Sequence, residues 1–171
     1  MRRADERMSR RGAGNRGVVG ILVMVAALAG MSACSPADKP VLAVRAVDGR
    51  PVLLFAECAV FEMERISVFT IEPTPAASWT VDREGDAEVT SVTVFELPPG
   101  WTVDEQTLVA FDPAVEYSAA AYGTQRDAIP VHFTLDELTA LGPGDVLVPE
   151  SAGKRKAVTE TAFRKRAKKT C

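Results

Sequence analysis

Three cysteines and one histidine give this 171-residue chain its widest range of side-chain chemistry. A thiol can be acylated, oxidised to a disulfide or used as a nucleophile, and an imidazole can move a proton near neutral pH. The cysteines are Cys34, Cys58 and Cys171, an odd number, so in an exported chain one of them has a separate fate. His132 alternates with apolar residues in 129-IPVHF-133, a pattern typical of a strand histidine rather than a catalytic one.

Motifs for nucleophilic, metal and nucleotide chemistry are missing from the sequence. No G-x-S-x-G elbow accompanies His132, and no zinc-ligand spacing, phosphate-cradling loop or dinucleotide fingerprint occurs. Asp82, Glu84 and Asp86 weakly resemble a calcium loop, but the glycine is misplaced and no distal glutamate follows. A solvated turn explains them better. The sequence therefore predicts no enzyme, no cofactor and no metal, with an envelope hydrolase that uses His132 as the alternative.

The amino-terminal segment has the order of a secretory signal. Residues 1–17 are basic, residues 18–30 form an apolar core of thirteen residues, and small residues precede Cys34. An uncleaved membrane helix is the alternative, because residues 17–37 carry no charge and are long enough to span a bilayer. The small and polar residues after Gly30 weaken that interpretation, and no basic stop-transfer cluster follows.

The segment 31-MSAC-34 resembles the lipobox of bacterial lipoprotein precursors, with Met31 in place of the more common leucine. The resemblance implies cleavage between Ala33 and Cys34, a diacylglycerol thioether on Cys34 and an acylated new amino terminus. Two or three acyl chains hold a protein firmly at a membrane where one does not. Residues 1–33 are then the signal peptide, and residues 34–40 are a lipidated linker. The body is expected at the outer face of the bacterial cytoplasmic membrane.

Lipidation of Cys34 leaves Cys58 and Cys171 as disulfide partners in an oxidising exterior. The chain between them also resembles uncharacterised actinobacterial lipoproteins and secreted proteins. The shared features are a cysteine after an early strand, a Pro-Pro-Gly-aromatic turn at 98–101 and a closing helix with a phenylalanine before the last cysteine. This resemblance supports the disulfide and implies no activity.

The body, residues 41–171, predicts one mainly β domain. Short apolar runs are separated by turn signals such as Asp48-Gly49-Arg50, which favours a small antiparallel β-sandwich, Ig-like or related. Thr134 and Glu137 form a capping box before a short helix at 135–141. The segments 79-WTVD-82 and 101-WTVD-104 are expected to begin strands and to place their tryptophans in the core. The strands are expected at 41–47, 51–57, 63–71, 78–81, 88–97, 108–111, 115–122, 129–133 and 145–148.

Charge is strongly segregated along the chain. Residues 34–149 hold six basic and nineteen acidic side chains, whereas residues 150–171 hold eight basic and two acidic ones. A basic helix is expected at about 159–170, with Thr159 as its N-cap. Two explanations of its charge stay open: neutralisation by Glu57, Glu62 and Glu64, which the disulfide would bring near, or contact with anionic lipid headgroups. We favour the first.

These patterns predict a binding or interaction module, lipid-anchored through Cys34, with a protein or cell-wall partner in the envelope. An acidic body with a basic end is not typical of nucleic-acid binding, which needs a basic face on the body itself. Neither ligand nor partner follows from the sequence. A hydrolase, or a single-pass anchored protein without lipid, is the competing interpretation.

Overall fold

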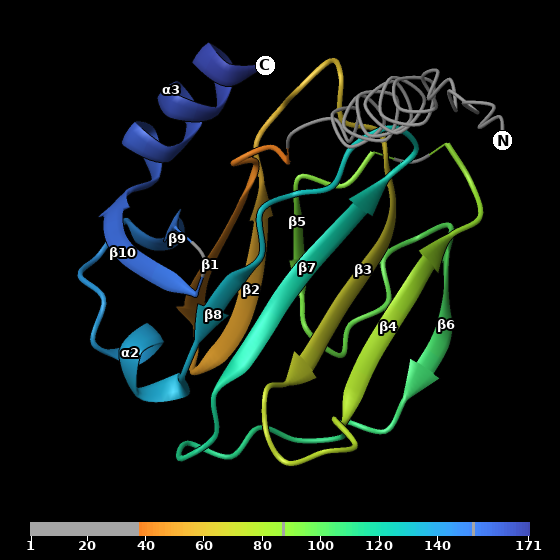
Figure 1. Ribbon diagram of the computed structural model, residues 1–171, viewed down its shortest axis with the longest axis vertical. Helices are drawn as coiled ribbons and strands as arrows, with labels where there is room; N and C mark the ends of the chain where they lie inside the picture. The colour runs from red at the N-terminus through yellow and green to blue at the C-terminus, as the bar shows by residue number, and fades with distance from the viewer. Residues whose placement is uncertain (1–37, 87, 152) are drawn as a thin grey trace, which may run out of the picture. The chain divides into compact units, whose positions relative to one another are not determined.

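The computed structural model describes residues 38–86, 88–151 and 153–171, which form two antiparallel five-stranded sheets packed on a common core (Figure 1). This confirms the predicted β-sandwich. The strands are β1 Leu42–Val47, β2 Arg50–Phe55, β3 Met63–Thr70, β4 Ser78–Arg83, β5 Ser91–Thr93, β6 Trp101–Gln106, β7 Tyr117–Gly123, β8 Val131–Phe133, β9 Asp145–Ser151 and β10 Lys154–Thr159. The helices are α2 Leu135–Thr139 and α3 Glu160–Thr170. The predicted leader, the lipobox and Cys34 lie outside the described residues.

Neither helix of the described residues is long and apolar enough to cross a membrane.

Half of the strand pairs in the two sheets are hairpins of consecutive strands. One sheet has the order β10-β9-β1-β2-β5 and the other has the order β6-β4-β3-β7-β8. The neighbour orders β1-β2-β5 and β4-β3-β7-β8 match the A-B-E and C′-C-F-G orders of immunoglobulin domains. The hairpin of β9 and β10 extends the first sheet beyond β1, so the fold is related to the Ig sandwich without reproducing it.

The turn between β1 and β2 shows how local sequence sets the register. Val47 pairs with Arg50, which leaves Asp48 and Gly49 as a two-residue loop. Both loop residues have positive φ, 51° and 75°, as a type I′ turn requires. The predicted break at 48–50 is confirmed.

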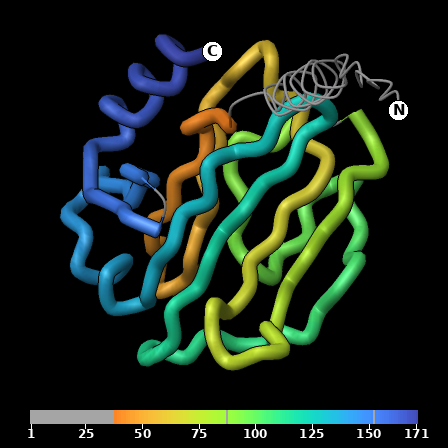
Figure 2. The backbone as a smooth tube through the Cα atoms, in the orientation of Figure 1, coloured from red at the N-terminus to blue at the C-terminus, as the bar shows by residue number. Residues whose placement is uncertain are grey.

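The core lies between the inner faces of the sheets, whose two layers are visible in Figure 2. Alternate residues of β3, such as Ile66 and Val68, are fully buried there. A chain of aromatic rings crosses the core, with successive centroids 4.8 to 6.2 Å apart. These rings belong to Trp79, Phe95, Phe111, Tyr117 and Phe133.

The two WTVD segments lie side by side as neighbouring antiparallel strands, β4 and β6. Trp79 lies opposite Gln106 and Trp101 lies opposite Arg83, so the tryptophans occupy opposite ends of the strand pair. Their side chains are 1% and 3% exposed. The prediction that both tryptophans lie near strand starts and fill the core is confirmed.

Several predicted strands differ from the observed ones. The predicted strand 88–97 is observed only as β5, Ser91–Thr93, and Phe95, with a φ of 71°, lies in the turn that follows it. Residues 108–111 form a loop that places Leu108 and the Phe111 ring against the core. The sequence interpretation gave only the start of β6, at Trp101, and missed β10, because both are edge strands whose residues are mostly exposed and lack apolar alternation.

Helix α2 begins with the predicted capping box. The Glu137 backbone N–H donates to Thr134 Oγ1 at 3.3 Å, and the Thr134 backbone N–H donates to the Glu137 carboxylate at 2.9 Å. The helix ends at Thr139, two residues earlier than predicted, with Ala140 as its C-cap. The capping prediction is therefore confirmed, and the predicted end at 141 is wrong.

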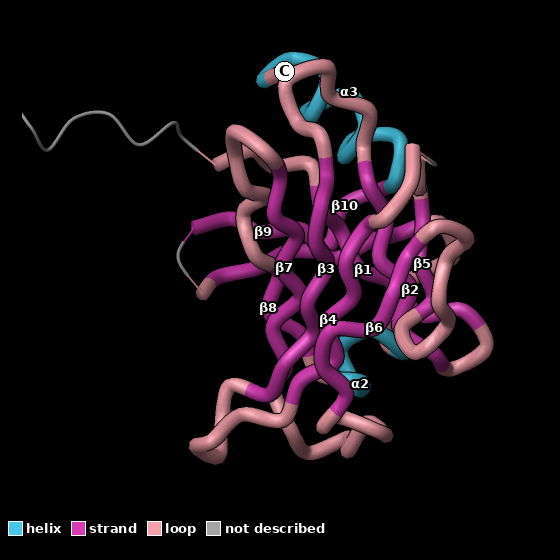
Figure 3. Tube along the Cα trace, turned by 90° about the vertical axis from the view of Figure 1, so that its right-hand side faces the viewer, coloured by secondary structure: helices cyan, strands magenta, loops and turns pink. Residues whose placement is uncertain are grey.

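Helix α3 begins after Thr159, whose hydroxyl accepts a hydrogen bond from the Ala162 N–H at 3.2 Å. Phe163 and Ala167 are 2% and 0% exposed and attach the helix to the sandwich. Ala162, the residue before Phe163, is exposed. Figure 3 shows α3 and α2 at opposite ends of the domain.

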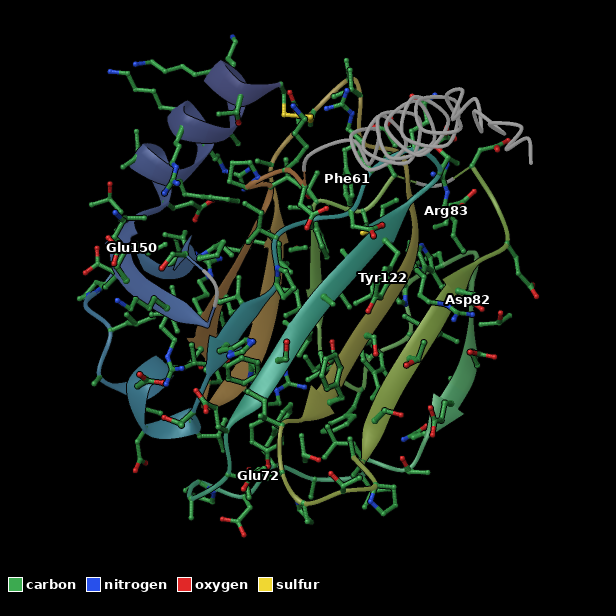
Figure 4. The ribbon with its side chains drawn as sticks, in the orientation of Figure 1. Phe61, Glu72, Asp82, Arg83, Tyr122 and Glu150 are labelled. Carbon is green, nitrogen blue, oxygen red and sulfur yellow. A yellow bond between two sulfur atoms is a disulfide. The ribbon has the colours of Figure 1, made fainter. Side chains whose placement is uncertain are left out.

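A disulfide joins Cys58, in the loop between β2 and β3, to Cys171 at the C-terminal end of α3 (Figure 4). The two residues are 113 positions apart in sequence, and their Cα atoms are 5.3 Å apart. The predicted pairing is confirmed. Because the bond links the last residue of the chain to an early loop, it encloses most of the domain.

Removing this disulfide is expected to destabilise the domain, because the unfolded chain then regains the freedom of a very long loop. In the chain-entropy model the loss is about 4–5 kcal/mol. Urea unfolding of a Cys58→Ser/Cys171→Ser variant measures it, with dithiothreitol-treated wild type as the matched comparison. Intact mass should rise by two hydrogens on reduction; two free thiols in untreated protein would contradict the bond.

Candidate functional site

The outer face of the second sheet carries a groove of about 640 Å³ across β3, β4 and β7. Strand alternation sends small polar side chains to this face, while their neighbours enter the core. The groove is lined by Glu64, Arg65, Ser67, Thr80, Asp82, Arg83 and Tyr122. Figure 4 shows Asp82 and Arg83 on β4 and Tyr122 on β7, the two strands that flank β3.

The groove's floor is a pair of hydroxyls. Ser67 Oγ and Thr80 Oγ1 lie directly opposite in the register of β3 and β4 and are 2.9 Å apart. Both residues are less than a tenth exposed. Small side chains on central strands leave a hollow between their larger neighbours, and the Tyr122 ring, 39% exposed, stands over one side of it.

Arg65 supplies the main charge of the groove. Its Nε and Nη2 atoms donate to the two Asp82 carboxylate oxygens at 2.7 and 2.8 Å, and Nη2 lies 3.1 Å from Asp104. These hydrogen bonds hold the pKa of Asp82 below its ordinary value, despite an opposing effect of burial. The same bonds raise the pKa of Arg65. The groove thus presents a fixed guanidinium–carboxylate fork rather than a free acid.

The weak calcium candidates do not converge on one point. Asp82 is committed to Arg65, and Glu84 and Asp86 lie exposed on the loop that follows β4. In the described part of the chain, no group of three or more histidine, cysteine or acidic residues is placed to hold a metal ion. Of these three candidates, Asp82 forms an ion pair with Arg65.

His132 lies on the edge strand β8, directly opposite Ser118 in β7. Its ring also lies near Gly153, at the tip of the hairpin between β9 and β10. Within the described residues, no hydrogen bond joins the imidazole to the Ser118 hydroxyl or to a carboxylate, and His132 does not line the groove. The arrangement that a hydrolase based on His132 needs is therefore not assembled here.

A second charged cluster joins the two sheets. Arg155 of β10 donates to the Glu137 carboxylate from Nε at 2.9 Å and from Nη2 at 2.7 Å, and it also pairs with Glu116 before β7. Burial would raise the pKa of Glu137, but the hydrogen bonds from Arg155 and Thr134 outweigh it and lower that pKa. Because Glu137 also caps α2, this cluster fixes the helix to both sheets.

Glu57, Glu62 and Glu64, which were expected to neutralise α3, make no ion pair with it within the described residues. Within the described residues, the ion pairs of α3 are made by Glu160, which contacts Arg45 at 2.9 Å and Arg164 at 2.7 Å. Glu62 instead approaches Arg83. The disulfide brings the helix end to the loop that holds Glu57, but within the described residues the lysines of the helix make no ion pair. They are Lys165, Lys168 and Lys169, all exposed.

A smaller hollow of about 300 Å³ lies between α3 and the strands β9 and β10. Its wall is largely apolar, and Lys156 and Arg166 stand at its rim. Lys156 is already paired with Glu150 at 3.0 Å. The hollow is lined by Pro40, Val148, Pro149, Lys156, Val158, Ala162, Phe163 and Arg166.

Sequence reasoning missed the groove, because its residues come from three strands and meet only through the sheet register. The available signal was the alternation of small polar with apolar residues in 66-ISV-68 and 79-WTV-81. That alternation indicates which side chains lie on the outer face of a strand, but it does not indicate which strands lie beside it in the sheet. The local sequence marks Asp82 as a weak calcium candidate and gives no sign of its pairing with Arg65.

Comparison of the chain with protein-family models, with curated proteins and with solved structures finds no match.

The lowered pKa of Glu137 predicts acid sensitivity. A carboxylate whose pKa is lower in the folded protein stabilises the fold at pH values above its unfolded-state pKa, which is about 4.3 for glutamate. This stabilisation is lost as the pH falls through the pKa of the folded state. Glu137→Gln should therefore lower the unfolding free energy at pH 7 by about 1–2 kcal/mol. It should also flatten the decline of stability below about pH 5.

Urea unfolding from pH 7 to pH 3 measures both effects. Glu105→Gln is the matched control, because Glu105 is exposed and makes no ion pair within the described residues. Equal pH slopes for Glu137→Gln and the wild type would contradict the role of the Arg155 cluster.

Proposed function

We propose that this protein is a binding module anchored by lipid on Cys34 at the outer face of a bacterial cytoplasmic membrane. The proposal has two parts, a location and a role. The location rests on the cysteines, and the role rests on the groove of the second sheet. Each part has its own experiment.

The location is supported by the disulfide between Cys58 and Cys171. Stable structural disulfides form in oxidising compartments outside the cytoplasm. The bond also uses two of the three cysteines, so Cys34 is the only thiol left for another modification. Its position after an apolar segment and two small residues is where a lipoprotein precursor carries its lipid.

The observation that carries the binding role is the open groove over β3, β4 and β7. Its floor offers two hydroxyls, its side offers the Arg65–Asp82 fork, and Tyr122 adds an exposed ring. Such a surface suits a polar partner held by hydrogen bonds and ring contact rather than an apolar ligand buried in a closed cavity. An envelope protein or a cell-wall component has this chemistry.

Replacing Cys34 tests the location. Cys34→Ala should release the protein from the membrane fraction or leave it at precursor size, because neither lipid attachment nor the following cleavage can occur. Fractionation and gel mobility measure this in the native host. Ser35→Ala, one residue away, is the matched control and should behave as wild type. Normal mature size with full membrane retention of Cys34→Ala would contradict lipid anchoring and favour an uncleaved helix.

Photo-crosslinking on intact cells tests the role. A photoreactive amino acid at Tyr122, 39% exposed in the groove, should give a discrete adduct, whereas the same group at Val47, 40% exposed on β1 of the other sheet, should not. Ser67→Ala/Thr80→Ala removes the hydroxyl floor and should weaken the Tyr122 adduct while thermal unfolding shows the domain intact. Equal labelling at Tyr122 and Val47, or an adduct insensitive to the floor variant, would contradict binding at the groove.

A further inference from the structure

We propose that the outward face of α3 binds the anionic headgroups of the membrane to which the protein is tethered. The inference rests on the proposed anchoring at Cys34 and adds an orientation: the α3 end of the domain faces the bilayer. Three observations support it: residue Lys39, where the described chain begins to contact the domain, lies beside α3; the exposed face of α3 is basic; and the rest of the body is acidic.

The chain enters the domain beside the C-terminal end of α3. Lys39 Nζ donates to the Thr170 backbone carbonyl at 2.6 Å. The disulfide at Cys171 lies at this same end, as Figure 4 shows. Lys39 lies five positions after Cys34, and a fully extended chain over that interval spans at most about 18 Å. A lipid on Cys34 therefore keeps this end of α3 close to the headgroups.

The face of α3 that points away from the sandwich is basic. Phe163 and Ala167 are buried against the core, and a helix turns 100° per residue, so the opposite face holds Lys165, Lys168 and Lys169. All three lysines are exposed, and none makes an ion pair within the described residues. Arg164 differs, since Glu160 holds it four residues earlier.

Other surfaces of the domain are poor candidates for membrane contact. Residues 34–149 hold six basic and nineteen acidic side chains, so an anionic surface repels most of the body. The loop beside the disulfide carries exposed Glu57 and Glu62, so we assign the contact to the lysine face of α3 rather than to this loop. The charge segregation then has a function: it selects which end of a tethered domain faces the lipid.

Each lysine near an anionic leaflet strengthens association about fivefold, so three together contribute roughly 100-fold. Such binding is weak for a free domain. It becomes effective when a short tether holds the face at a high local concentration.

The test uses residues 34–171, which contain the whole described core, coupled through the Cys34 thiol to a maleimide lipid in vesicles. With the disulfide closed, Cys34 is the free thiol of this chain. A fluorescent amino acid at Thr161 on α3, or at Asp136 on α2 at the opposite end, reports energy transfer to a headgroup-labelled lipid. Strong transfer is expected from Thr161 and weak transfer from Asp136 on vesicles containing phosphatidylglycerol.

Lys165→Gln/Lys168→Gln/Lys169→Gln should reduce the ratio of docked to undocked domain about 100-fold, as should vesicles of phosphatidylcholine alone. Arg50→Gln/Arg126→Gln/Lys154→Gln changes the net charge equally at other positions and should retain docking. Equal transfer from Thr161 on both vesicle types, or an equal loss in both triple variants, would overturn the proposal. Because the tether is chemical, this result is independent of lipidation in cells, which Cys34→Ala tests separately.

Discussion

The disulfide between Cys58 and Cys171 is the constraint on which the arrangement of this domain depends. It fixes Cys171, at the C-terminal end of α3, to the loop between β2 and β3. The bond closes a loop of more than a hundred residues and holds this end of α3 against the sandwich. Packing of Phe163 and the hydrogen bond from Lys39 act at the same helix. The bond thus sets where the basic end of the chain lies relative to the chain's entry into the domain.

The two faces of the second sheet differ in their side chains: the inner face forms the core and the outer face carries the polar groove. The inner face is filled by buried apolar residues such as Ile66 and Val68, which allows the outer face to carry small hydroxyl residues and a groove. The Arg155 cluster joins this sheet, the other sheet and α2 from outside the core. Rigid support from both layers makes the outer face a fixed surface, which suits a binding module.

Much of the fold followed from local sequence signals, and the groove did not. The Asp48-Gly49 turn, the Thr134 capping box and the Thr159 cap were predictable, because neighbouring residues alone determine them. The edge strand β10 was not predicted and β6 was predicted only at its start, because most of their side chains are exposed and show no apolar alternation. The meeting of Arg65 with Asp82 depends on strand register across the sheet, which local patterns do not give.

The central claim is that the mature chain begins at Cys34, carries lipid there and has its other two cysteines joined. The intact mass of the native protein, extracted from membranes in detergent, tests all three points at once. We expect the mass of residues 34–171, less two hydrogens for the disulfide, plus that of a thioether-linked diacylglycerol with or without a further acyl chain. An unmodified mass that still includes residues 1–33 would contradict the claim.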